Sequence, residues 1–241
     1  MPRYPAPWWA RRRKIQLPYI NTFKTIWEYE ESFLARRIDF SSSIGPECPL
    51  CGGLHCCRQI SPYLRYAIEL FPEFKKKRIP VARFLCRKTG KTFSLLPIQL
   101  IPYFQYTVSA VLGTLLLGLG CRQTGQRGFH GASVQVDPES LVTPWLVACW
   151  VMTVLKGLQR AHAMLGRWYD LNAISIAPQR AMGWEEVSAY LLCFGWNPQL
   201  HSRPVFCEVL HRYCRTTKRF LFGIPSQERI RRSTFSMEKA L

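Results

Sequence analysis

Acidic side chains are scarce in this sequence. Its 241 residues include 15 Asp and Glu against 33 Lys and Arg, which gives a formal net charge of +18. The excess lies at the two ends, with +11 in residues 1–91, zero in residues 92–155 and +7 in residues 156–241. A charge of this size favours a polyanionic partner, either nucleic acid or an anionic membrane surface. Apolar residues make up 48%, too many for a disordered chain and enough for a core.

A secretory signal is also lacking at the N-terminus. The basic run that ends at Lys14 follows Trp8 and Trp9, and the next residues, 15–21, contain no long apolar stretch. A reducing, cytoplasmic compartment is therefore expected. The chain has ten cysteines, and in such a compartment closely spaced cysteines indicate metal binding rather than disulfides.

Three of these cysteines have the spacing of zinc-binding turns. The first turn is Cys48-Pro-Leu-Cys51-Gly, and the second is Cys86-Arg-Lys-Thr89-Gly, in which threonine occupies the position of the second cysteine. Zinc prefers four tetrahedral ligands, so one more is needed. Residues shortly after Cys51 can supply it. We predict one Zn²⁺ held by Cys48, Cys51, Cys86 and one of His55, Cys56 or Cys57.

This pattern resembles the zinc-ribbon heads of bacterial transposases and of a related, uncharacterised family of transposase-like proteins. The resemblance covers about residues 45 to 110. Thr89 departs from the family pattern, which has a cysteine there. The matching residues are Cys48, Cys51, Cys86, Gly90, Lys91 and Thr92-Phe-Ser-Leu-Leu-Pro97, followed by Tyr103 and Tyr106. The resemblance implies DNA binding in a mobile-element setting and a helix-turn-helix after the ribbon.

The expected fold class is α+β, a small zinc-ribbon-like β module with a helical insert followed by a larger, mainly α-helical domain. Helical spacing predicts the insert at 62–74, and a β-branched, aromatic stretch predicts a strand at 79–85. The expected parts are a basic arm with a short helix at 23–39 (1–44), the ribbon (45–97), the helical domain (98–222) and a basic tail (223–241). A linker is expected at 41–46.

The helical domain begins with an uncharged segment of 30 residues, Thr92 to Cys121. Pro97 and Pro102 confine its helix to about 103–118, roughly 24 Å long, which is shorter than a bilayer core of about 30 Å. A second uncharged run, 140–155, contains Pro144. Packed core helices are therefore expected, and a small membrane protein with two short spans is the alternative. The glycine-rich segment 122–136 predicts a connection or weak helix, and Asp137-Pro predicts a helix start.

The motifs of common hydrolases and phosphate-binding loops are absent from the sequence. A DNA-cutting transposase of the common kind needs three carboxylates around two metal ions. Only eight acidic residues follow Pro97, and none lies on an apolar strand. Catalysis is not predicted, and an active transposase with an unrecognised centre remains the alternative.

Basic residues cluster in the N-terminal arm, where Arg11 to Lys14 follow Trp8 and Trp9, and again from Lys75 to Lys91 beside the second cysteine turn. Phosphate contacts are expected from them because a solvated charge run beside a zinc-binding turn suits a nucleic-acid surface. The predicted function is thus DNA binding by a zinc-ribbon protein, with DNA as the partner and self-association left open. The predicted contact residues are Arg11, Arg12, Arg13, Lys14, Lys75, Lys76, Lys77, Arg78, Arg83, Arg87, Lys88 and Lys91.

Overall fold

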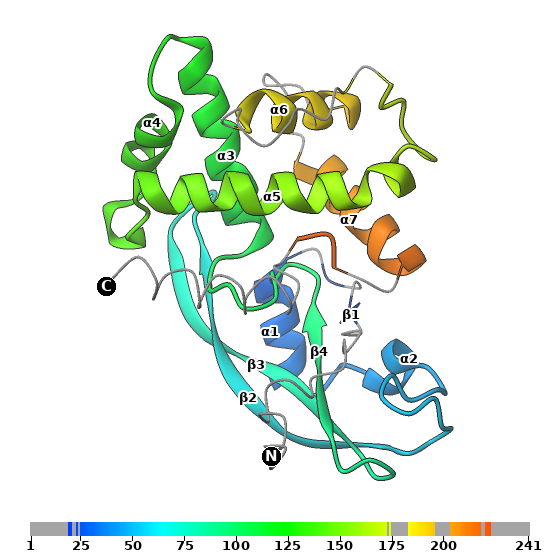
Figure 1. Ribbon diagram of the computed structural model, residues 1–241. Coiled ribbons are helices and arrows are strands. Elements are labelled where there is room, and N and C mark those ends of the chain that lie inside the picture. The colour runs from blue at the N-terminus through cyan, green and yellow to red at the C-terminus, as the bar shows by residue number, and fades with distance from the viewer. Residues whose placement is uncertain are drawn as a thin grey trace, which may run out of the picture.

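The computed structural model describes residues 19–20, 23, 25–172, 174, 183–195, 203–217 and 220–222. The predicted contacts at 11–14 and the predicted tail at 223–241 lie outside these residues. Figure 1 shows the arrangement of the elements. In chain order they are β1 (Tyr19–Ile20), α1 (Ile26–Leu34), α2 (Phe40–Ile44), β2 (Cys57–Glu69), β3 (Lys75–Cys86), β4 (Thr92–Pro97), α3 (Val108–Gln123), α4 (Gly128–Gln135), a 3₁₀ turn η1 (Pro138–Ser140), α5 (Pro144–Leu165), α6 (Trp184–Cys193) and α7 (Arg203–Thr217).

The strands form one sheet in the order β1-β4-β3-β2. The β2 and β3 strands pair antiparallel over most of their length, from Cys57 opposite Cys86 to Glu69 opposite Lys75. The β4 strand pairs antiparallel with β3 and parallel with β1. At about 3.3 Å per residue, the 13 residues of β2 span roughly 40 Å. The mixed α+β class is confirmed.

The helix predicted at 62–74 is wrong, because residues up to Glu69 form β2. Leu64, Ala67, Ile68 and Phe71 match helical spacing, but Tyr63–Tyr66 also alternate between half-buried and exposed, as strand residues do. Pairing with β3 decides in favour of the strand. Pro62 is tolerated because β2 is an edge strand and its register shifts between Ile60 and Tyr63.

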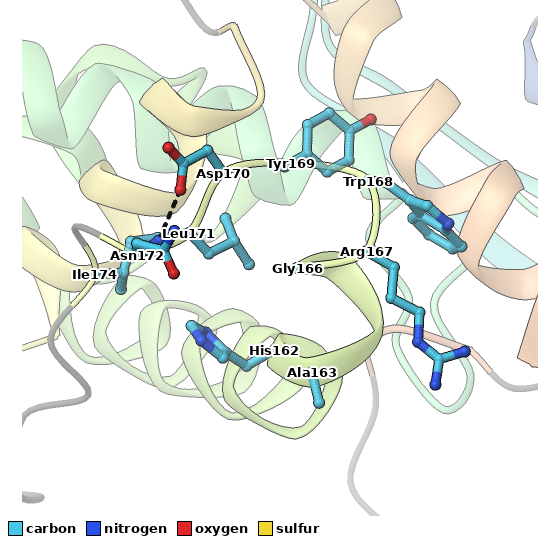
Figure 2. Close-up of a pocket in the computed structure, with 10 residues that line it drawn as sticks. All are labelled: His162, Ala163, Gly166, Arg167, Trp168, Tyr169, Asp170, Leu171, Asn172 and Ile174. Carbon is cyan, nitrogen blue, oxygen red and sulfur yellow. Dashed lines mark hydrogen bonds between the residues drawn. The ribbon is translucent and has the colours of Figure 1, made fainter.

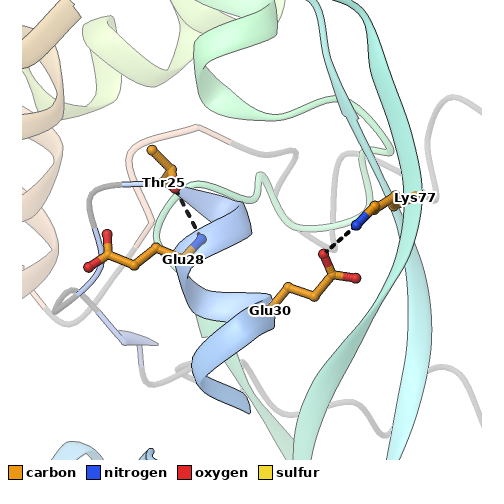
Figure 3. Close-up of polar contacts among 4 residues, drawn as sticks. All are labelled: Thr25, Glu28, Glu30 and Lys77. Atoms are coloured by element: carbon orange, nitrogen blue, oxygen red, sulfur yellow. Dashed lines mark hydrogen bonds and ion pairs between the residues drawn. The ribbon is translucent and has the colours of Figure 1, made fainter. Parts of the chain in front are cut away.

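The α1 helix packs on this sheet, with Ile26 and Tyr29 buried. The Tyr29 hydroxyl donates to the Pro80 carbonyl at 3.0 Å. Figure 3 shows two further contacts: Glu28 N–H donates to the Thr25 side chain at 3.1 Å, and Lys77 pairs with Glu30 at 3.2 Å. The helix is shorter than the predicted 23–39. The linker predicted at 41–46 is also wrong in part, because α2 occupies Phe40–Ile44.

The helices after the sheet share one apolar core. It contains much of α3 and the inward side of α5, including Trp150 and Leu158, and it extends to Trp184 and Tyr190 of α6. The helical parts of the two uncharged segments thus pack in the same core, as predicted, whereas the β4 part of the first segment packs in the core of the sheet. In the part of the chain that the structure describes, none of the helices has the length and apolar character needed to cross a bilayer.

Helix boundaries in this part differ from the predictions. The helix expected at about 103–118 begins only at Val108, after the N-cap Thr107. Asp137 caps the short η1 turn rather than a long helix, and α5 begins at Pro144 after the N-cap Thr143. The glycine-rich segment at 122–136 contains α4. The α3 and α5 helices each begin where a threonine hydroxyl accepts a hydrogen bond from the third residue that follows it.

The β2 and β3 strands form a long hairpin, and one end of this hairpin is hydrogen-bonded to the segment that leads into α3. Arg65 Nη2 donates to the Ile101 carbonyl at 2.5 Å and to the Phe104 carbonyl. Ile68 N–H donates to the Gln105 carbonyl at 2.9 Å. The opposite end of the hairpin, where Cys57 faces Cys86, is free of these contacts and carries the cysteine turns.

Candidate metal centre

Four cysteine sulfurs converge at the end of the hairpin: Cys48, Cys51, Cys56 and Cys86. All four atoms lie within 4.8 Å of one another. Cys51 Sγ is 3.4 Å from Cys56 Sγ and 3.6 Å from Cys86 Sγ, and the Cys56 and Cys86 sulfurs are 3.8 Å apart. Around a tetrahedral zinc ion with bonds of about 2.3 Å, sulfurs are about 3.8 Å apart. The spacing is therefore compatible with a single metal ion.

Two turns of matching backbone geometry hold these cysteines. In the Cys48 turn (48–53), Gly52 N–H donates to the Cys48 carbonyl at 2.8 Å and Cys48 N–H donates to the Gly53 carbonyl at 3.0 Å. In the Cys86 turn (86–91), Gly90 N–H donates to the Cys86 carbonyl and Cys86 N–H to the Lys91 carbonyl, both at 2.9 Å. Both central glycines have left-handed backbone, with φ of 70° and 64°, which side chains disfavour.

Thr89 occupies the place that Cys51 has in the other turn. The Cys51 sulfur accepts from Gly53 N–H at 3.4 Å, and the Thr89 hydroxyl accepts from Lys91 N–H at the same distance. A hydrogen bond from the Thr89 side chain lowers the pKa of the Cys86 thiol to about 6. The second turn thus keeps its shape but lacks its second sulfur, and Cys56 supplies the fourth instead.

The three candidates for the fourth ligand lie in different surroundings. Cys56 is buried and donates to the Gly53 carbonyl at 3.6 Å, which keeps its sulfur against the Cys48 turn. His55 is exposed, has a positive φ of 49° and does not join the group of four sulfurs. Cys57 begins β2, is half-buried and packs beside the group without belonging to it.

The environment favours thiolate at two of the sulfurs. Burial raises the pKa of Cys48, but hydrogen bonds from the backbone amides of Leu50 and Cys51 and from the thiols of Cys57 and Cys56 together outweigh it, so the net shift is downward. Burial raises the pKa of Cys56, and it raises that of Cys57 to about 11. A bound cation would favour thiolate at every ligand, so metal binding would release protons and weaken as the pH falls.

Lys88 packs against the Cys48 turn. A Cβ atom placed on Gly53 would lie 2.8 Å from Lys88 Nζ and 3.3 Å from Cys51 Sγ. The ammonium group and this sulfur therefore lie on either side of the same small space, no more than about 6 Å apart. At that distance the ammonium group would offset part of the negative charge of four thiolates around a divalent ion. Lys88 was predicted to contact a phosphate. In the structure its side chain lies against the Cys48 turn, near Cys51.

The other predicted contact residues are distributed along the hairpin. Arg87 and Lys91 are exposed in the Cys86 turn. Arg83 is half-buried in the middle of β3, opposite Ile60 and Ser94. Lys75, Lys76, Lys77 and Arg78 are exposed at the far end. Sequence reasoning missed Arg58, which is exposed opposite Leu85 beside the cysteine turns.

A separate, open pocket of about 730 Å³ lies at the end of α5 (Figure 2). His162 Nδ1 lies 2.6 Å from the hydroxyl of the buried Tyr190, whose pKa burial raises to about 12. Asp170 accepts from Asn172 N–H at 3.1 Å. His162 thereby links α5 to α6, and Asp170 stabilises the local turn at Asn172.

Comparisons with protein-family models, with curated proteins and with solved structures gave no match. The features of this chain that bear on its function are therefore the geometry of the four cysteines and the charges around them.

Proposed function

We propose that this protein binds one Zn²⁺ through Cys48, Cys51, Cys56 and Cys86, and DNA through the basic surface around that centre. The observation that carries the proposal is the convergence of four sulfurs within 4.8 Å. Soft thiolate ligands in a tetrahedral set select zinc or iron–sulfur chemistry, and the spacing fits a single ion. A site filled by four protein ligands leaves no open position, so its role is structural.

We infer that the module is a zinc ribbon with one displaced ligand. The two matching turns support this, because each has its glycine, its left-handed backbone and its pair of backbone hydrogen bonds. In the ordinary arrangement the fourth sulfur would come from position 89. Here the chain after the first turn folds back and brings Cys56 to the same group.

Exposed cations around this centre support the nucleic-acid part of the proposal. Arg58 lies on β2, and Arg87 and Lys91 lie in the Cys86 turn, all at the same end of the hairpin. A metal-anchored turn would hold these side chains in fixed positions, so that they contact phosphates without a large loss of entropy on binding.

The local roles of acidic residues after the sheet favour binding over catalysis. Asp137 caps the η1 turn, Glu185 pairs with Arg122, and Glu186 accepts from Gln159 Nε2 at 3.0 Å. These carboxylates stabilise local structure. The transposase-like character of the chain is accordingly proposed for DNA binding alone.

The test is the salt dependence of binding to a labelled DNA duplex. If four to six side chains meet phosphates, log K should fall with log salt at a slope of roughly −4 to −5. Vesicles of phosphatidylcholine containing phosphatidylserine, in the same buffer, provide the comparison with an anionic membrane. Binding to duplex that ignores salt, or tighter binding to the vesicles, would overturn the proposal.

A further inference from the structure

The basic run Lys75–Arg78 is divided between two sides of the sheet. Side chains of a strand alternate between its faces. Lys75 pairs with Glu73, and Lys77 pairs with Glu30 at 3.2 Å and lies 5.8 Å from the centre of the Trp27 ring. These two lysines are therefore neutralised by carboxylates of their own chain.

The alternate pair, Lys76 and Arg78, surrounds an exposed tyrosine instead. Arg78 lies directly opposite Tyr66 in the β2–β3 register. Lys76 Nζ and Arg78 Cζ lie over the Tyr66 ring, 5.5 Å and 5.8 Å from its centre. Within the described part of the chain, neither cation forms an ion pair with a carboxylate. Both charges therefore remain available to an anionic ligand.

Tyr66 projects from the edge strand of the sheet and is 41% exposed. Leu64, two residues earlier and hence on the same face of β2, is 54% exposed. In Figure 1 the β2 and β3 strands form a long curved arm. The β2–β3 register places Tyr66 and Leu64 in the half of this arm away from the cysteine turns. The surface thus combines an aromatic ring, an apolar neighbour and two unneutralised cations.

We propose that Tyr66, Lys76 and Arg78 bind single-stranded DNA. The two exposed cationic side chains move from the Tyr66 ring to the neighbouring phosphates, and an unpaired base stacks on the ring in their place. Aromatic side chains accept any base by stacking, and cations beside them hold the backbone. A base within a duplex is already stacked on its neighbours, so this site takes an unpaired one. The inference rests on the proposed function for its class of partner, but it uses different residues from the metal end.

The experiment measures binding of the full-length protein to a labelled oligothymidylate and to an abasic oligomer of the same length. Tyr66→Ala should weaken binding to oligothymidylate roughly 5- to 100-fold, the usual effect of removing one stacking ring. Binding to the abasic oligomer should not change, because it offers phosphates without bases. Tyr66→Phe should behave as the unsubstituted protein, since the ring is retained.

A matched pair of double variants tests the two cations. Lys76→Ala with Arg78→Ala should flatten the single-strand salt slope by about 1.4, since each phosphate contact contributes about 0.7. Lys75→Ala with Lys77→Ala removes the same charge but should change that slope much less, because those lysines are already paired with Glu73 and Glu30. Equal effects of the two double variants would contradict the assignment.

Two outcomes would overturn the stacking site: unchanged oligothymidylate binding in Tyr66→Ala, or an equal loss on the abasic oligomer. Should Tyr66→Ala lower the thermal midpoint, Tyr66→Leu keeps the apolar bulk without the ring and must show the same loss. A failure of the proposed function can be distinguished from a failure of the stacking site, because duplex binding tests the first and oligothymidylate binding tests the second. If duplex binding ignores salt while single-strand binding depends on Tyr66, the stacking site stands and the metal-end surface does not.

Discussion

Replacing Cys86 with serine is expected to abolish metal binding and to unfold the cysteine end of the hairpin. Cys86 is the only one of the four ligands on β3, so its sulfur links the Cys48 turn to the sheet. A structural zinc ion contributes about 10–16 kcal/mol to the folding of a small module. Elemental analysis of the purified protein should give one zinc per unsubstituted chain and none for Cys86→Ser.

Two further variants make this prediction specific. Cys57→Ser is the control, because Cys57 packs beside the four sulfurs without belonging to them, and it should retain one zinc. Cys56→Ser should lose the metal. Adding Thr89→Cys to Cys56→Ser should restore it, since the Thr89 hydroxyl occupies the place of a sulfur in the Cys86 turn. Zinc retained by Cys86→Ser, or lost from Cys57→Ser, would disprove the ligand set.

Replacing Arg87 and Lys91 together with alanine is expected to flatten the salt dependence of duplex binding by about 1.8 units of slope. Each phosphate contact contributes about 0.9, and both side chains are exposed in the Cys86 turn. Lys88 is left unchanged because it packs against the Cys48 turn beside Cys51. Any preference among DNA sequences should persist, since phosphate contacts position a protein and base contacts specify its site.

The matched control for this pair is again Lys75→Ala with Lys77→Ala, which removes two charges at the far end of the hairpin. Fluorescence anisotropy over a range of salt concentrations gives both slopes. If the two double variants flatten the slope equally, net charge rather than the metal-end surface determines duplex binding. If neither changes it, the duplex binds elsewhere on the chain.

The two cysteine turns could be predicted because their geometry is local. Gly52 directly follows Cys51 in the first turn, and Gly90 directly follows Thr89 in the second. Both glycines adopt the left-handed backbone that this kind of turn requires. The fourth ligand could not be chosen, because His55, Cys56 and Cys57 are adjacent in sequence. Their selection depends on how the chain folds back: Glu47 bridges to Leu54, and Cys57 then enters β2, which leaves Cys56 at the centre.

The hairpin could not be predicted from local spacing alone. The apolar residues in 62–74 fit both helical spacing and the alternating spacing of a strand. Pairing with β3, which the sequence does not show, selects the strand. The predicted strand began at 79, whereas β3 begins at Lys75. The extra residues place the basic run within a strand. Alternation then divides the run into two lysines paired with carboxylates and two cations beside Tyr66, a division that a loop would not impose.

In the helical part, the sequence was sufficient to predict that packed helices form but not where each helix begins. Proline breaks and short uncharged runs correctly predicted packed helices, because such segments can bury their surface only against one another. Their predicted starts were too early: Pro102 allows a helix from 103, but α3 begins at Val108, and α5 begins at Pro144 rather than after Asp137. Asp137 is a good cap, but Leu141 adopts a left-handed backbone with φ of 57°, which interrupts the helix until Thr143.

The central claim is that the metal centre organises a basic surface for DNA. The most direct test measures duplex binding on one preparation before zinc removal by a chelator, after removal, and after zinc is returned. Zinc removal should flatten the salt slope at least as much as the Arg87 and Lys91 double variant does, and returned zinc should restore the slope. An unchanged slope and affinity in the metal-free protein would contradict the claim.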